Sequence, residues 1–237
     1  SWDDGDRSCR RFQAYSSDLT PNGAPSHFAA PDPCDELIYS TFAIDVDGSF
    51  FAMWQDRPSE AVNRMIARRF AADAQPVGDA HVVSTETPGW RGWPAVGFDP
   101  SGLALIAWPF GDAADDRNVV AGRLLDLVGQ PVGDEVLISP NRTDYIQTPS
   151  VLSEGDGIFV VLWDDWWRGG VVGRRVSADT NGGGPTTTTT LPSPLNDPRF
   201  ESTRVLTSYE SSGGSPWSAP IIGGAEGRWY VGAPAGN

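Results

Sequence analysis

Short apolar runs that follow a glycine and end at a tryptophan recur along this sequence. Residues 48–54 read Gly-Ser-Phe-Phe-Ala-Met-Trp, and residues 102–108 and 157–163 repeat the pattern. Residues 227–233 keep the leading glycine but end in alanine. The four glycines, at positions 48, 102, 157 and 227, are 54, 55 and 70 residues apart. A period of this size indicates a repeat architecture.

Each repeat is expected to contain four short strands. In the second repeat, residues 94–98, 103–108, 119–125 and 135–138 are apolar runs separated by turns with Gly and Pro, a pattern that predicts strands. The corresponding strands are predicted at residues 40–44, 48–54, 65–70 and 81–84 in the first repeat, and at residues 149–152, 157–163, 171–176 and 203–206 in the third. Because no stretch keeps a helical period, the sequence predicts an all-β fold.

The N-terminal residues match the second half of a repeat. Trp2-Asp-Asp corresponds to Trp163-Asp-Asp, and Cys9-Arg-Arg-Phe12 corresponds to Ala67-Arg-Arg-Phe70. The chain therefore begins at the end of the second strand of a repeat and continues through its third and fourth strands.

The C-terminal residues supply the complementary half, with two strands predicted at residues 220–223 and 227–233. Four-stranded units of about 55 residues are typical of β-propeller blades. We therefore predict one domain, residues 1–237, that is a β-propeller of four four-stranded repeats closed by pairing of the two terminal half-blades. The alternative is that the chain is a fragment of a larger propeller. Residues 181–198, rich in Thr, Pro and Gly, are predicted to be an inserted, exposed loop.

Beyond the glycine-to-tryptophan runs, the repeats share an Arg-Arg strand and a turn that reads Gln-Pro-Val-Gly at residues 75–78 and 130–133. Together these motifs resemble the β-propeller repeats of large secreted bacterial surface proteins. The resemblance covers nearly the whole chain at the level of the repeat. The resemblance implies an extracellular protein that binds a partner. Such repeats share no common set of catalytic residues, and the resemblance does not indicate which ligand is bound.

Composition narrows the function classes. The 237 residues include no lysine, and 17 Arg against 31 Asp and Glu give a formal net charge of −14. A nucleic-acid-binding protein needs a basic surface, so a nucleic-acid partner is not expected. The sequence contains no run of 18 apolar residues, so no membrane insertion is expected either.

The two cysteines are Cys9 and Cys34. Because the sequence has neither an initial Met nor a signal peptide, we expect a mature secreted product or an excised fragment, and we favour a protein that is secreted or displayed on the cell surface. In such an oxidising setting a disulfide between Cys9 and Cys34 is predicted.

The loops expected at one end of the propeller are rich in Trp and Asp. They contain Trp90, Trp93, Tyr145, Asp164, Asp165, Trp166, Trp167 and Trp217. Aromatic rings can stack on the C–H surfaces of sugars, and carboxylates accept hydrogen bonds from hydroxyl groups. These residues are therefore candidates for a glycan-binding site. The alternative is that the aromatic side chains pack between repeats and that the Asp residues form turns.

The tryptophans that end the apolar runs, Trp54, Trp108 and Trp163, stand at one fixed place in the repeat and are predicted to be packing residues. The recurring Arg10, Arg68, Arg123 and Arg174 are likewise predicted to be structural, and to pair with a turn Asp on a neighbouring strand.

Calcium is a second candidate ligand. Asp45 and Asp47, in the sequence Asp45-Val-Asp-Gly48, offer carboxylate oxygens at short spacing, as calcium prefers. An Asp-Gly pair is also an ordinary hairpin turn, so a purely structural role is the alternative.

Taken together, these features predict a secreted binding or adhesion module that recognises a glycan or a protein partner. Membership of a larger extracellular assembly is a further option. The alternatives are a secreted hydrolase acting on polysaccharide and a structural scaffold of a surface assembly. A glycosidase requires two carboxylates at a defined separation, and the sequence alone pairs none. A non-catalytic role is therefore favoured.

Overall fold

The chain forms antiparallel β-sheets joined by turns. The computed structural model describes residues 2–3, 10–15, 18–27, 38–59, 62–85, 88–112, 115–139, 146, 148–165, 170–179, 184–186, 221–223 and 229–231. No helix occurs among these residues, so none of them forms a helix that could cross a membrane. The all-β prediction is confirmed.

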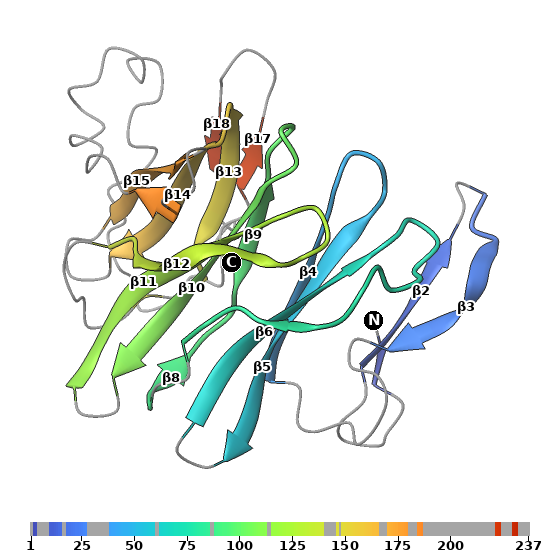
Figure 1. The fold of residues 1–237 in the computed structure, drawn as a ribbon, viewed down its shortest axis with the longest axis horizontal. Helices are drawn as coiled ribbons and strands as arrows, with labels where there is room; N and C mark the ends of the chain where they lie inside the picture. Colours follow the sequence, from blue (N-terminus) through green and yellow to red (C-terminus); the bar gives the residue numbers. More distant parts are fainter. Residues whose placement is uncertain are drawn as a thin grey trace, which may run out of the picture.

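Three larger sheets follow one another along the chain (Figure 1). The first contains β4 (Ile38–Ile44), β5 (Phe50–Ser59), β6 (Val62–Phe70) and β7 (His81–Val82) in that order. The second contains β8 (Trp90–Arg91), β9 (Ala95–Phe98), β10 (Ala104–Asp112), β11 (Asp115–Leu125) and β12 (Pro131–Leu137), with β8 and β9 both paired to β10. The third contains β13 (Ser150–Gly155), β14 (Ile158–Asp165), β15 (Gly170–Asp179) and β16 (Gly184–Thr186).

Two smaller sheets are formed near the ends of the chain. One contains β1 (Trp2–Asp3), β2 (Arg10–Tyr15) and β3 (Pro21–His27), and the other contains β17 (Ile221–Gly223) and β18 (Trp229–Val231). Among the described strands, these two sheets are not paired with each other. Ring closure, and with it the four-bladed propeller, therefore remains a prediction.

The repeat predicted from the glycines is visible in the strand register. The first two strands of each repeat pair at the same positions relative to the glycine at 48, 102, 157 or 227. The paired residues are Phe42 with Ala52, Val96 with Ile106, Val151 with Val161, and Ile221 with Val231.

Successive large sheets pack against each other, with β9 lying against β4 on one side and against β13 on the other. Side chains alternate along each strand, so one sheet contributes to the cores on both of its sides. Trp108 and Ile106 pack towards the first large sheet, whereas Leu105 packs towards the third. Trp54, Trp108 and Trp163 are all buried, as predicted for packing residues.

The repeated arginines are structural, but their partners differ from the prediction. Arg68 Nε donates to the carbonyl oxygen of Gly78, and Arg123 Nε donates to that of Gly133. Arg174 donates at 2.7 Å to the carbonyl oxygen of Ile138. These guanidinium groups thus bind backbone carbonyl oxygens, of their own sheet for Arg68 and Arg123 and of the preceding sheet for Arg174, rather than the predicted turn Asp.

The N-terminal alignment also needs correction. Gln13 Nε2 donates to the carbonyl oxygen of Gly23, the bond that Arg68 makes to Gly78. Gln13, rather than Arg10, therefore stands at the repeated arginine position. The match of Trp2 to the other repeats holds, since Trp2 pairs with Arg11 on β2 as Trp54 pairs with Ile66 on β6.

Two further segments differ from the predicted strand pattern. β16 lies inside residues 181–198, the predicted exposed loop, and pairs with β15. It occupies the outer position that had been predicted for residues 203–206, which lie outside the described residues. Trp90, predicted in a loop, lies in the short strand β8.

Asp99 connects the second and third large sheets. Its carboxylate accepts hydrogen bonds from the amide of Ser101 at 2.8 Å, from the hydroxyl of Ser153 at 2.6 Å and from the amide of Gly157 at 3.2 Å. Burial alone would raise the pKa of Asp99, but the hydrogen bonds outweigh burial and hold this pKa below its ordinary value.

We therefore expect Asp99→Asn to destabilise the fold in a pH-dependent way. A carboxyl group with a depressed pKa stabilises the folded state above its unfolded pKa of about 3.9, and this contribution is lost as pH falls through the folded pKa. The variant should lose about 1–2 kcal/mol of unfolding free energy at pH 7 and much less at pH 3, measured by urea denaturation. Asp126→Asn, which alters a carboxylate that caps its own turn, is the matched control. An Asp99→Asn loss that is the same at both pH values would contradict this account.

Candidate functional site

Part of the predicted aromatic surface lies at the end of the sheets where β8 pairs with β10 and lies against β6, in the lower part of the view in Figure 1. We call this the Trp90 end of the sheets. Trp90 and Trp93 both belong to the segment 88–94, which leads into β9. The structure therefore brings these two predicted residues together on one short stretch of backbone.

Trp90 is half-buried, and its indole lies across glycines. A Cβ atom on Gly92 would come within 2.6 Å of Trp90 Cη2 and 2.8 Å of its Cζ2, and one on Gly111 would be 3.6 Å from its Cε3. The absence of side chains at Gly92 and Gly111 is thus what allows the ring to lie close to the backbone. Pairing of Gly111 with Trp90 holds this arrangement in register.

Trp93 follows β8 and has 45% of its surface exposed. It is flanked by two buried residues, Gly92 and Pro94, and the amide of Gly92 donates at 3.0 Å to the carbonyl oxygen of Pro109. A large aromatic side chain is therefore presented to solvent from a backbone that is held on both sides.

Arg91 anchors this segment to the first large sheet. Its side chain is fully buried, and its guanidinium donates to the carbonyl oxygens of Asn63 and, at 2.6 Å, of Thr85. The guanidinium carbon also lies 4.9 Å from the centre of the Phe110 ring. Burial lowers the pKa of Arg91, and the negative charge of Glu135 acts in the opposite direction.

Polar side chains of β5 and β6 lie at the same end of the sheets. The side-chain amide of Asn63 donates at 2.7 Å to the carbonyl oxygen of Gly89, and its Oδ1 accepts at 3.0 Å from Arg57 Nε. Arg64 forms an ion pair with Asp56, with Nη2 2.6 Å from Oδ2. The Trp90 end therefore combines an exposed aromatic ring with amide, guanidinium and carboxylate groups, which can bind hydroxyl groups.

The remaining predicted residues of this surface are placed only in part. Asp164 is half-buried in β14, and Asp165 ends that strand. Tyr145, Trp166, Trp167 and Trp217 lie outside the described residues, as do Cys9 and Cys34. The disulfide therefore stays a prediction.

Sequence reasoning did not single out Arg57, Asn63 and Arg91 as candidate residues of this end. Arg91 stands next to Trp90, and its position could have drawn attention to it. Its burial could not be read from the sequence, because an arginine in a Gly/Trp-rich segment is usually exposed.

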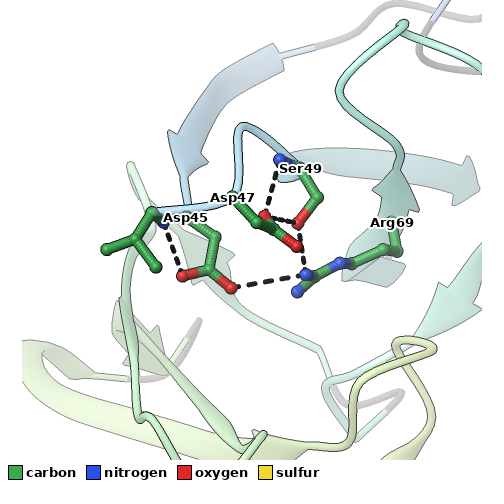
Figure 2. Close-up of polar contacts among 5 residues, drawn as sticks. Asp45, Asp47, Ser49 and Arg69 are labelled. Carbon is green, nitrogen blue, oxygen red and sulfur yellow. Dashed lines mark hydrogen bonds and ion pairs between the residues drawn. The ribbon is translucent and has the colours of Figure 1, made fainter.

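Asp45 and Asp47 lie at the opposite end of the sheets, in the turn between β4 and β5 (Figure 2). Asp47 accepts from the amide of Ser49 at 2.8 Å and from its hydroxyl at 2.5 Å, and these bonds lower the pKa of Asp47. Asp45 accepts from the amide of Val46 at 2.7 Å and pairs at 3.4 Å with Arg69, which also donates to the Ser49 hydroxyl. Both carboxylates thus have structural partners within the turn.

The described residues contain no group of three acidic, His or Cys side chains that could hold a metal ion. Arg69 has a second structural role, since its guanidinium carbon lies 5.1 Å from the ring of Phe51 and 5.4 Å from that of Phe98. The contacts at Asp45 and Asp47 fit the turn-forming alternative, and calcium binding stays an untested prediction.

Searches with the sequence found no matching family model and no matching curated protein. Solved structures that resemble the chain include an N-acetylgalactosamine deacetylase from F. plautii in complex with blood group B trisaccharide, with 14% identity and a TM-score of 0.38 over 66% of this chain and 46% of that one. A second is an endo-arabinase from Bacteroides thetaiotaomicron, with 14% identity and a TM-score of 0.37 over 68% of this chain and 58% of that one. A third is a glycoside hydrolase, with 15% identity and a TM-score of 0.41 over 83% of this chain and 43% of that one. The chain spans about half the length of these proteins. At these TM-scores none of them assigns a family or an activity to it.

Proposed function

We propose that the chain is a secreted or cell-surface binding module, built as a four-bladed β-propeller, that recognises a glycan through the Trp90 end of its sheets. The observation that carries this proposal is Trp93, a large aromatic side chain that is 45% exposed on an anchored segment. An exposed tryptophan on a rigid backbone binds at low entropic cost, because little conformational freedom is lost.

The polar groups at the Trp90 end support a hydroxyl-rich ligand. Asn63 and Arg57 offer N–H donors, and the Asp56–Arg64 pair offers a carboxylate beside further donors. A sugar presents apolar C–H surfaces and hydroxyl groups together, so an aromatic ring with amide and charged neighbours matches it in both respects.

Trp93→Ala is expected to weaken glycan binding about tenfold or more. The loss of one aromatic contact of about 1.4 kcal/mol corresponds to a factor of ten in Kd. Binding should be profiled on a glycan array and quantified by calorimetry with the best glycan. Trp93→Phe keeps an aromatic ring and should retain part of the affinity. Leu127→Ala removes an exposed apolar side chain at the opposite end of the sheets and should leave the affinity unchanged.

The array should be run with calcium and with EDTA, because calcium is the ion proposed for Asp45 and Asp47. A loss of binding in EDTA that Asp45→Asn reproduces would establish a calcium requirement. A blank array in both buffers, or binding that Trp93→Ala leaves intact, would overturn the glycan proposal at this surface. Release of soluble sugars from a polysaccharide would replace the binding proposal with the hydrolase alternative.

A further inference from the structure

Gln55 is a fully buried polar residue whose side chain lacks hydrogen bonds. It lies in β5, and 0% of its surface is exposed. Neither atom of its side-chain amide, Oε1 nor Nε2, has a hydrogen-bond partner within the part of the chain that the structure describes. Burying an amide without hydrogen bonds is costly, so such a group in a folded protein is normally bonded to protein or to ordered water.

The indole Nε1 of Trp108 is a second buried polar atom of this kind. Trp108 lies in β10 and is 0% exposed, and its Nε1–H group, which can only donate, has no acceptor among the described residues. The hydroxyl groups of Ser84 and Ser139 are also buried, but each accepts a hydrogen bond from a backbone amide. Gln55 and Trp108 therefore differ from these satisfied buried groups.

Both groups face the core between the first two large sheets. Side chains alternate along β5, and Phe51 and Met53, which lie on the same side as Gln55, belong to this core. Met65, which pairs with Gln55 from β6 and shares its side of the sheet, belongs to it as well. Trp108 packs into the same core from β10. The amide of Gln55 and the indole N–H therefore lie in one interface, and each large sheet contributes one of them.

The position of Gln55 is apolar in the next repeat. Pro109 directly follows Trp108, as Gln55 directly follows Trp54. Trp163 packs into the core between the second and third large sheets, where this repeat position offers proline instead of glutamine. The repeat does not require a polar side chain here, so the buried amide is a particular feature of the interface between the first two large sheets.

Ala121 leaves space beside the indole of Trp108. Residues that pair across neighbouring strands share one side of the sheet, and the partners of the three repeat tryptophans are Ile66, Ala121 and Val172. Ala121 has the smallest side chain of the three, so its sheet fills less of the space beside the indole. A buried water needs polar partners and room for about one solvent sphere. The small neighbour and the unpartnered polar atoms thus occur at the same interface.

We propose that bound water lies between the first two large sheets and bridges Gln55 and Trp108. One water accepts a hydrogen bond from Trp108 Nε1 and donates one to Gln55 Oε1, and a second water accepts one from Gln55 Nε2. Each of the three buried polar atoms then has a partner, as buried polar groups in folded proteins usually do. The site does not include Trp93, so this proposal does not rest on glycan binding.

The polar atoms of the site favour water over other ligands. They comprise two donors and one acceptor, and neither side chain is charged. An anion would be repelled by Oε1 and a cation by the two N–H groups, whereas water both donates and accepts. A larger hydroxylated ligand, such as a sugar, would have to pass two side chains that have no exposed surface. Water is therefore the ligand that fits the site.

The direct test is the nuclear Overhauser effect between water and the indole N–H proton of Trp108 in the ¹⁵N-labelled full-length chain. Bound water should give a cross-peak with the sign of a long-lived complex at this proton, which is identified by its absence in Trp108→Phe. Gln55→Met removes the amide, keeps a side chain of similar length and should lose most of this cross-peak. Gln75→Met is the matched control, because Gln75 is exposed between β6 and β7, and it should leave the cross-peak unchanged. No cross-peak in the unmodified chain, or an undiminished one in Gln55→Met, would overturn the proposal.

A high-resolution crystal structure of the unmodified chain is a second test that does not depend on the folding of a variant. Water density should lie within about 3.2 Å of both Trp108 Nε1 and Gln55 Oε1. A direct hydrogen bond between these two atoms would overturn the proposal. A protein group in place of the water would also overturn it, since the chain itself would then satisfy the buried polar atoms.

Discussion

Replacing Arg91 with methionine is expected to lower the free energy of unfolding by about 3 kcal/mol. The guanidinium is fully buried and donates to two backbone carbonyl oxygens, of Asn63 and Thr85. Hydrogen bonds to a charged group contribute about 1.5–3 kcal/mol each, and both carbonyl groups would lose this donor. Relief from burying a charge offsets part of the loss. Urea denaturation at pH 7 measures the change.

Arg68→Met is the matched control for Arg91→Met. Arg68 is partly exposed and donates to a carbonyl oxygen at 3.2 Å, so its removal should cost less than about 1 kcal/mol. Arg91→Met should also weaken glycan binding, because Arg91 anchors the segment that carries Trp90 and Trp93. Equal stability losses for the two variants would show that the buried contacts of Arg91 do not hold the first two large sheets together.

Gly89→Ala is expected to destabilise the fold by about 3 kcal/mol or more. Gly89 has φ of 135°, a conformation that other residues rarely adopt. A Cβ atom there would collide with the carbonyl oxygen of Gly111 and would lie 2.8 Å from Phe110 Cε2. The backbone would have to move, and the bond from Asn63 to the Gly89 carbonyl oxygen would be lost with it. Thermal or urea denaturation measures this loss.

Gly78→Ala is the control that separates the cost of backbone strain from the cost of the Cβ collision in Gly89→Ala. Gly78 also has a positive φ, 82°, but nothing lies within 4 Å of an added Cβ. Its substitution should cost about 1 kcal/mol, from the strained conformation alone. If Gly89→Ala lowered the free energy of unfolding by no more than Gly78→Ala does, the close approach of the Gly89 segment to β10 would not contribute to stability.

The repeat and its strands could be predicted from the sequence because local chemistry specifies them. A glycine with positive φ is required where the first two strands of a repeat are joined, as at Gly48 and Gly102. Side chains along the next strand alternate between its two faces, and both faces are buried at residues 51–55 and 104–109. Trp54, Trp108 and Trp163 were therefore assigned correctly to the core, and β17 and β18 were found at the predicted place.

The partners of long side chains could not be predicted in this way. Arg123 reaches the carbonyl oxygens of Gly133 and Val83, and the second of these belongs to the preceding sheet. Such a contact depends on the spacing between sheets, which no local pattern encodes. Gln13 was missed as the counterpart of Arg68 for a different reason, because the Cys-Arg-Arg-Phe motif at residues 9–12 suggested a different alignment.

The sequence by itself determined an all-β repeat protein and its strand positions, because turn conformation and side-chain alternation act over a few residues. Only the tertiary structure decided which polar groups of neighbouring sheets meet at the Trp90 end, such as Asn63 with the carbonyl oxygen of Gly89. These outcomes depend on how sheets pack face to face, and packing brings together residues that are far apart in the chain.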